Sequence, residues 1–337
     1  MKKLALLCCL LVSTSVWAAT PAYHVVKTLK LGGDGFWDYL SVDSGAGRLY
    51  VSRWTHVMVV DLDTDKLVGD IPNTEGVHGI ALAPDLGRGF ISCGRTNEAL
   101  IFNLKTLKVI GKVVTGAGPD AILYDPASKR VFTMNGHGQS ATAFDAATGK
   151  IAGTIDLGGK PEEARADGKG KIYINIEDKS QVVELDSHKL TILKRFSLAP
   201  GEEPSGMGLD VAHHLVFSGC HNQMMTVLDP VAGKVIATVP IGRGVDGAAY
   251  DPGTGLAFAS NGEGTLTVVR ETSPGKFAAE NVPTVRSART MALDPKTHDI
   301  YLSAAKFEPM PRAKASERRQ RPKMVKGSFM IVVVGRE

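Results

Sequence analysis

The chain has little of what would assign it to several common protein classes. No apolar run approaches the roughly 20 residues that a membrane helix needs. No stretch of helix length shows an apolar face with a period of 3.6 residues. Histidine and cysteine never occur in HxxxH or CxxC spacing, and Gly32-Gly33-Asp34-Gly35 lacks the strand and helix that flank a phosphate loop. These absences exclude a helical membrane protein, a metal site preformed by one motif and a nucleotide-binding loop.

What the chain has instead is an internal repeat with a period of about 42 residues. In each copy an acidic or amide residue ends an apolar run and is followed five positions later by Lys, or once by Thr. Successive anchors lie 42, 42, 41 and 43 residues apart, and they are Asp61, Asn103, Asp145, Asp186 and Asp229. A second recurring pattern, seen most clearly in residues 120–126, agrees with this spacing and indicates seven copies in all.

The third copy shows what one repeat contains. Residues 121–124 are apolar, residues 130–134 are β-branched and aromatic, residues 139–144 alternate in polarity, and residues 151–157 complete the unit. Four short strands in a repeat of roughly 40 to 45 residues are typical of a β-propeller blade, which buries its faces against its neighbours. The sequence therefore predicts an all-β fold, a seven-bladed β-propeller of four-stranded blades.

The two ends of the chain predict how the ring closes. The seventh repeat supplies three strands, at residues 290–293, 299–303 and 329–334, and is one strand short. Residues 23–31 precede the first blade and have no repeat of their own. We expect this N-terminal strand to complete the last blade, because closure removes the exposed edges that invite aggregation.

Residues 1–18 have the pattern of a secretory signal peptide: two lysines, an apolar stretch, and Val16-Trp17-Ala18 as a small-residue cleavage site. We therefore expect residues 19–337 to form a single propeller domain in the periplasm, monomeric and without a transmembrane segment. That domain retains Cys93 and Cys220, which the repeat places in blades two and five. A disulfide needs Cα atoms within about 7 Å, so we expect buried free thiols.

Positive charge is concentrated in one insertion in the seventh blade, residues 306–327. Residues 306–326 hold eight basic and two acidic residues, and the formal net charge of the whole chain is +4, so the rest of the chain is net negative. Three prolines, and no aromatic residue beyond Phe307, predict a long loop between two strands. The loop is either a solvated insertion or a binding segment for anionic groups.

Several strand ends resemble a known repeat motif, notably residues 131–136, 171–175 and 256–262. They are similar to the motif of YVTN-repeat β-propellers, and residues 19–337 resemble the YncE-like family of secreted bacterial proteins over all seven blades. The resemblance implies a secreted propeller; proposed roles in the family include surface layers, single-stranded DNA binding and relationship to lactone-hydrolysing propellers. Blades one, two and five depart from the motif, and no catalytic residue is carried over.

The propeller model places a ring of polar residues at one end of the central channel, where loops enter the innermost strands. This ring is Asp38, His78, Asp120, Glu162, Ser205, Asp246 and Arg289. A second tier on the same face comes from the turn after the next strand, and it is Arg53, Arg95, His137, Glu177, His221, Glu263 and Lys306. Trp37 and Trp54 lie beside it. Polar groups with aromatic surface are typical of a ligand site.

Three functions fit this face. The first is binding of a small molecule, protein or polyanion without catalysis, or no ligand beyond ordered water. The second is a lactonase-like hydrolase with a divalent cation as cofactor, held by residues such as Asp38, His78, Asp120, Glu162 and His221. The third is a single-stranded nucleic-acid or polyanion binder acting through the basic loop. Aromatic residues make up 6% of the chain and the ring is acidic, so the channel face itself is a poor nucleic-acid surface.

Overall fold

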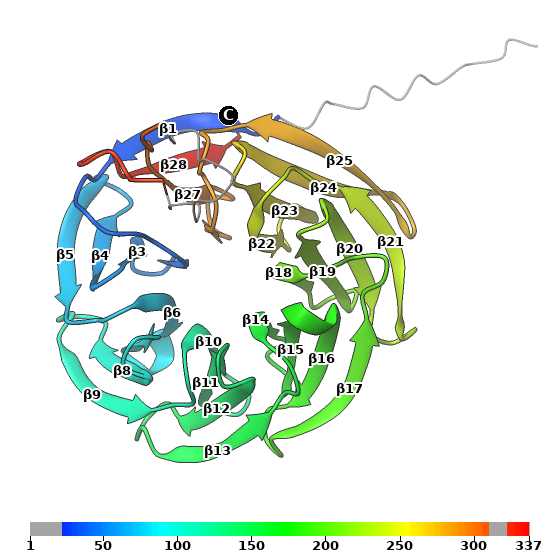
Figure 1. Cartoon of the computed structure of the whole chain (residues 1–337), viewed down its shortest axis with the longest axis horizontal. Helices are drawn as coiled ribbons and strands as arrows, with labels where there is room; N and C mark the ends of the chain where they lie inside the picture. The colour runs from blue at the N-terminus through cyan, green and yellow to red at the C-terminus, as the bar shows by residue number, and fades with distance from the viewer. Residues whose placement is uncertain (1–21, 310–321, 337) are drawn as a thin grey trace, which may run out of the picture.

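The computed structural model describes residues 22–309 and 322–336 and is built of seven four-stranded antiparallel sheets arranged around a central axis. Figure 1 looks down this axis: β6, β10, β14, β18 and β22 lie near it, and β1 lies at the rim. The prediction of a seven-bladed propeller is confirmed. The predicted signal peptide, and residues 310–321 of the basic insertion, lie outside the described residues.

Blades one to six run outward from the channel in chain order, and the seventh ends on the N-terminal strand. Blade one is β2 (Leu40–Asp43), β3 (Arg48–Arg53), β4 (His56–Asp61) and β5 (Lys66–Pro72). Blade two is β6 (Val77–Ala83), β7 (Arg88–Cys93), β8 (Glu98–Asn103) and β9 (Val109–Val114). Blade three is β10 (Pro119–Asp125), β11 (Arg130–Asn135), β12 (Ser140–Asp145) and β13 (Ile151–Asp156). Two short 3-10 helices, η1 (Pro84–Leu86) and η2 (Glu177–Lys179), lie in turns.

The remaining blades repeat the pattern. Blade four is β14 (Pro161–Ala166), β15 (Lys171–Ile176), β16 (Gln181–Asp186) and β17 (Thr191–Ser197), and blade five is β18 (Pro204–Asp210), β19 (Leu215–Cys220), β20 (Met224–Asp229) and β21 (Lys234–Pro240). Blade six is β22 (Val245–Asp251), β23 (Leu256–Asn261), β24 (Thr265–Ser273) and β25 (Lys276–Pro283). Blade seven is β26 (Met291–Leu293), β27 (Ile300–Ala304), β28 (Met330–Gly335) and, outermost, β1 (His24–Lys30).

The repeat anchors are explained by the turn between the third and fourth strands. Each anchor ends a third strand, and its side-chain oxygen accepts a hydrogen bond from the backbone N–H three residues later. Asp61 accepts from Thr64 at 2.8 Å, and Asp145 accepts from Thr148 at 2.7 Å. An Asx side chain that satisfies a turn N–H favours the tight reversal between strands. The anchors therefore mark the hairpins of blades one to five.

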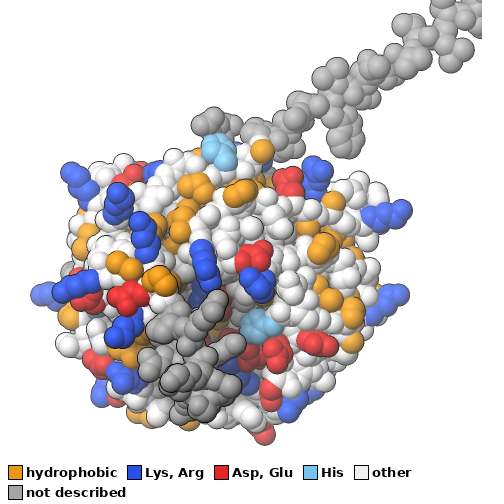
Figure 2. All heavy atoms as spheres, turned by 45° about the horizontal axis from the view of Figure 1, so that its top comes forward, with side chains coloured by type: hydrophobic (Ala, Val, Ile, Leu, Met, Phe, Trp, Pro, Cys, Tyr) orange, Lys and Arg blue, Asp and Glu red, His pale blue; other side chains and the backbone are white. Residues whose placement is uncertain are grey.

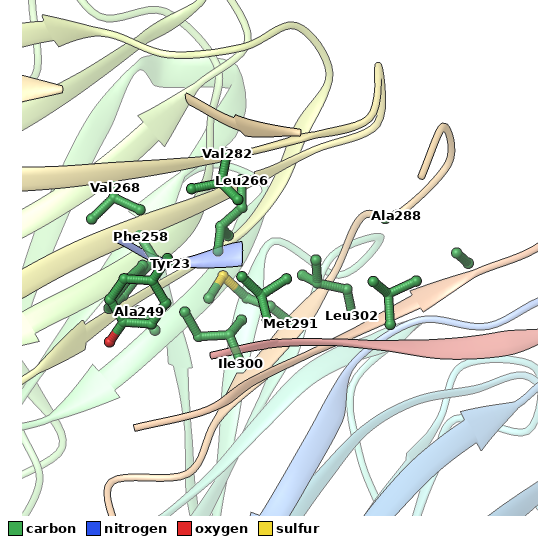
Figure 3. Packing of buried hydrophobic residues seen from close by; sticks show 13 residues of the cluster. Tyr23, Ala249, Phe258, Leu266, Val268, Val282, Ala288, Met291, Ile300 and Leu302 are labelled. Atoms are coloured by element: carbon green, nitrogen blue, oxygen red, sulfur yellow. The ribbon is translucent and has the colours of Figure 1, made fainter. Parts of the chain in front are cut away.

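The N-terminal strand closes the ring, as predicted. β1 pairs antiparallel with β28, from His24 opposite Gly335 to Lys30 opposite Met330. Just before β1, Tyr23 is 5% exposed and lies edge-on to Phe258 of blade six, with ring centroids 5.1 Å apart. Figure 3 shows the Tyr23 ring among the apolar side chains of blades six and seven. The first described residues thus join the last two blades.

The apolar core lies between adjacent blades, in seven clusters. Where innermost strands approach closely, glycine is required: a Cβ on Gly206 would lie 2.3 Å from the backbone nitrogen of Ala248. Cys93 and Cys220 are buried free thiols, as expected. Among the described residues, no helix has the length and apolar character needed to cross a membrane.

Candidate functional site

The predicted ring residues gather at one end of the channel. The prediction placed each of them just before its innermost strand. Five are instead the second residue of that strand: His78, Asp120, Glu162, Ser205 and Asp246. Asp38 and Arg289 do precede their strands, β2 and β26. Figure 2 shows acidic and basic side chains gathered with a histidine on one face of the molecule.

Serines of the second strands help to fix the ring. The backbone N–H of Asp38 donates to Ser52 Oγ at 2.8 Å, and that of Gly79, next to His78, donates to Ser92 Oγ at 2.8 Å. Both serines are fully buried. Blades one and two depart from the repeat motif, because Ser52 and Ser92 stand where the motif has a Thr. The departure therefore has a structural role at the ring.

Three ring residues from three blades form one cluster. His78 Nδ1 lies 2.6 Å from Asp38 Oδ2 and 3.6 Å from Asp120 Oδ1. One nitrogen or oxygen atom from each of the three residues lies within 4.8 Å of the others. Their side chains are 37%, 26% and 24% exposed, so the cluster can be reached from solvent. We call Asp38, His78 and Asp120 the channel triad.

The triad is strongly coupled electrostatically. Burial opposes charge on His78, but the hydrogen bond to Asp38 and the nearby Asp120 carboxylate outweigh it and raise the pKa of His78 to about 9. Burial, followed by repulsion from Asp38, raises the pKa of Asp120 above its ordinary range. Protonated His78 therefore offsets part of the negative charge of Asp38 and Asp120, whose carboxylates would otherwise repel each other more strongly.

Beside the triad, a lysine holds two more predicted acids. Lys160 Nζ lies 2.6 Å from Glu162 Oε1 and also contacts Glu177 Oε2. The Lys160 backbone is set by η2, because its N–H donates to Asp178 Oδ1 at 2.7 Å. Burial and the charge of Asp120 raise the pKa of Glu162. Glu162 is thus engaged by an ammonium group and is not a member of the triad.

The other predicted residues make polar contacts of their own, away from the triad. Asp246 Oδ2 lies 3.4 Å from Arg289 Nε, and His221 Nδ1 lies 3.4 Å from Glu203 Oε2. Ser205 is buried, and its hydroxyl donates to the Asp246 backbone oxygen at 3.1 Å. His221 is therefore separate from the triad with which it was predicted to share a metal.

The second tier and the tryptophans are only partly on the open face. Arg95 and Trp54 are exposed and stacked, with the guanidinium carbon 5.0 Å from the indole centroid, and His137 is exposed. Arg53 is fully buried instead, 3.5 Å above the Phe329 ring. Trp37 is 9% exposed and packs against the same ring. Arg53 and Trp37 support the junction of blades one and seven, where a ligand on the face would not contact them.

Comparisons with known proteins support the fold alone. The chain has a TM-score of 0.75 and 12% identity to a structure of U3-55K, with 93% of this chain and 99% of that one covered. A crystal structure of RRP9 WD40 repeats gives a TM-score of 0.75 and 12% identity, with 94% and 99% covered. The fold is that of WD40 proteins. No family model and no curated protein sequence matches the chain.

Sequence reasoning missed the residue that lies beneath the triad. Tyr39 belongs to blade one, yet it packs on the apolar cluster between blades three and four, across the channel. Burial and the charges of Asp120 and Glu162 raise its pKa well above the ordinary value. The aligned repeats held a signal for it, because the residue after the ring position is Gly, Ala or Thr in five blades and Tyr39 or Glu163 in the others.

Proposed function

We propose that this protein is an exported binding propeller that holds a divalent cation at its channel triad. The observation that carries the proposal is the convergence of one imidazole and two carboxylates, from three blades, within 4.8 Å. Imidazole nitrogen and carboxylate oxygen are ligands that suit zinc, manganese and similar divalent ions. Export rests on the pattern of residues 1–18, and membership of the secreted YVTN-repeat propellers rests on the strand-end motifs.

The surroundings favour a cation over an anion. Asp38, Asp120, Glu162 and Asp246 all lie at the ring, and burial together with repulsion from Asp38 raises the pKa values of Asp120 and Asp246. A divalent ion would displace the proton of His78, neutralise both triad carboxylates and relieve this repulsion. Binding should therefore release protons and strengthen as the pH rises toward 9.

The test is thermal unfolding of the purified protein with and without Zn²⁺, Mn²⁺, Mg²⁺ or Ca²⁺. A ligand that binds the folded state alone raises Tm. We expect at least one of these ions to raise Tm, and Asp120→Asn to abolish the rise. Asp246→Asn is the matched control, since it removes a ring carboxylate outside the triad and should keep the rise. No shift with any ion, or equal loss in both variants, would contradict the proposal.

A hydrolase of lactonase type is the alternative that the same geometry favours. Three protein ligands leave a coordination position open, as in catalytic zinc sites, and a bound water there would have a lowered pKa. This function predicts hydrolysis of simple lactones that depends on added metal and is lost in His78→Gln. Metal binding without any such turnover would favour the binding function. Polyanion binding through residues 306–327 remains a separate proposal.

A further inference from the structure

The other end of the channel holds a cavity of about 470 Å³ that belongs to no site described so far. It is lined by the second halves of innermost strands, whereas the triad lies at their beginnings, and Tyr39 lies between the two ends. A volume of this size is within the range of small-molecule sites, roughly 300 to 1,000 Å³.

Most of the side chains that line this cavity are apolar, and the polar ones are Ser41, Arg165 and Tyr250. Leu82, Leu209, Met291 and Leu293 are among the lining side chains, and Arg165 is the single charged residue in the lining. The hydroxyl groups of the lining are already engaged: Ser41 Oγ donates to the Ile80 backbone oxygen, and the Tyr250 hydroxyl is hydrogen bonded to Asp210. Polar recognition in the cavity therefore falls to Arg165.

Arg165 is held in one orientation with one edge free. Its Nε donates to the Met207 backbone oxygen at 3.0 Å and its Nη2 to the Ala248 backbone oxygen at 3.3 Å. Nη2 also contacts the carboxylate of Glu163, which is 5% exposed and accepts the Met207 N–H at 2.7 Å. Within residues 22–309 and 322–336, Nη1 donates no hydrogen bond, and the Arg165 side chain is 41% exposed.

We propose that this cavity binds a small organic anion with an apolar body, its carboxylate or sulfonate on Arg165 Nη1 and its body against the leucine-rich wall. The guanidinium is suited to this role because it is planar, weakly hydrated and held in place by its other bonds. Glu163 offsets much of its charge, so recognition depends on the short-range hydrogen bond and little on long-range attraction. The site is independent of the channel triad.

The test uses 8-anilinonaphthalene-1-sulfonate, an apolar dye with one sulfonate, and its uncharged analogue N-phenyl-1-naphthylamine. Fluorescence titration of the full chain should give one saturable site for the sulfonate dye. A hydrogen bond to a charged group corresponds to about tenfold or more in affinity, so the uncharged analogue should bind at least about tenfold more weakly. Equal binding of the two dyes would overturn the assignment of Arg165.

Two variants separate the charge from the cavity. Glu163→Gln with Arg165→Gln removes both charges while keeping an acceptor for the Met207 N–H, and should reduce sulfonate affinity about tenfold without changing that of the analogue. Val211→Trp, at the cavity wall, should weaken both dyes, whereas Val231→Trp, 76% exposed in another turn, should weaken neither.

If the double variant does not fold, Val211→Trp and the comparison of the two dyes still decide the question. Unchanged sulfonate binding in Val211→Trp would place the dye elsewhere and overturn the proposal. Asp120→Asn should leave dye binding unchanged, so this result does not depend on whether the triad binds a cation.

Discussion

Replacing Tyr23 by Ala tests how the ring is closed. The Tyr23 side chain is 5% exposed, lies 5.1 Å from the Phe258 ring, and donates from its hydroxyl to the His298 backbone oxygen at 3.3 Å. Removing a buried aromatic ring costs about 3–5 kcal/mol of unfolding free energy, because the cavity adds to the lost transfer energy. The long hydrogen bond adds about 1 kcal/mol at most.

Thermal unfolding followed by circular dichroism measures this cost. For a chain of this size about 4 kcal/mol corresponds to a fall in Tm of about 6 °C, given an unfolding entropy of about 2.1 cal/mol/K per residue. Tyr23→Phe keeps the ring and should lose about 1 kcal/mol or less. Val26→Ala is the control within β1, since Val26 is 41% exposed and should change Tm by only about 1–2 °C. If Tyr23→Ala melts within that same margin, the N-terminal segment does not hold blades six and seven together.

Three further results are expected. Gly206→Ala should lower Tm strongly, because its Cβ would lie 2.3 Å from a backbone nitrogen, whereas Gly111→Ala, whose nearest neighbour is at 3.6 Å, should be neutral or slightly stabilising in the same melt. Without metal, Tm should fall from pH 6 to pH 9. The pKa of His78 is raised to about 9, so its proton stabilises the folded state and this stability is lost as His78 deprotonates, while ionising Asp120 in the folded state is costly. Asp120→Asn should make this fall shallower. Replacing residues 310–321 by a short Gly-Ser linker should leave Tm nearly unchanged and remove salt-sensitive binding to a fluorescent oligonucleotide; unchanged binding would mean that the segment is only a solvated insertion.

The fold was predictable because its determinants are local and repeated. Blades one to five use the same hairpin turn, with an Asp or Asn accepting a backbone N–H three residues later, so one physical device recurs at a fixed period. Closure was predictable by counting strands, since β26 to β28 lack a fourth partner and residues 23–31 lack a repeat. Neither step required knowledge of contacts between distant side chains.

The site was predictable only in part, because it depends on such contacts. The period aligns ring positions, so His78 and Asp120 were found, but it does not say which neighbours pair. Glu162 is held by Lys160, which is not one of the aligned ring positions. Arg53 and Arg95 were predicted to share one tier, yet Arg53 is the last residue of β3 and is buried against Phe329, from the far end of the chain, whereas Arg95 lies in the turn after β7.

The central claim is that a divalent cation binds at the channel triad. Crystals of the protein soaked in Mn²⁺, with diffraction data collected at a wavelength where manganese scatters anomalously, locate the ion without reference to activity. We predict an anomalous peak in contact with Asp38, His78 and Asp120, at about 2.0–2.3 Å from nitrogen and oxygen ligands, and its loss in Asp120→Asn crystals. Fully occupied manganese elsewhere, or no peak at the triad in crystals grown at pH 8, would contradict the account.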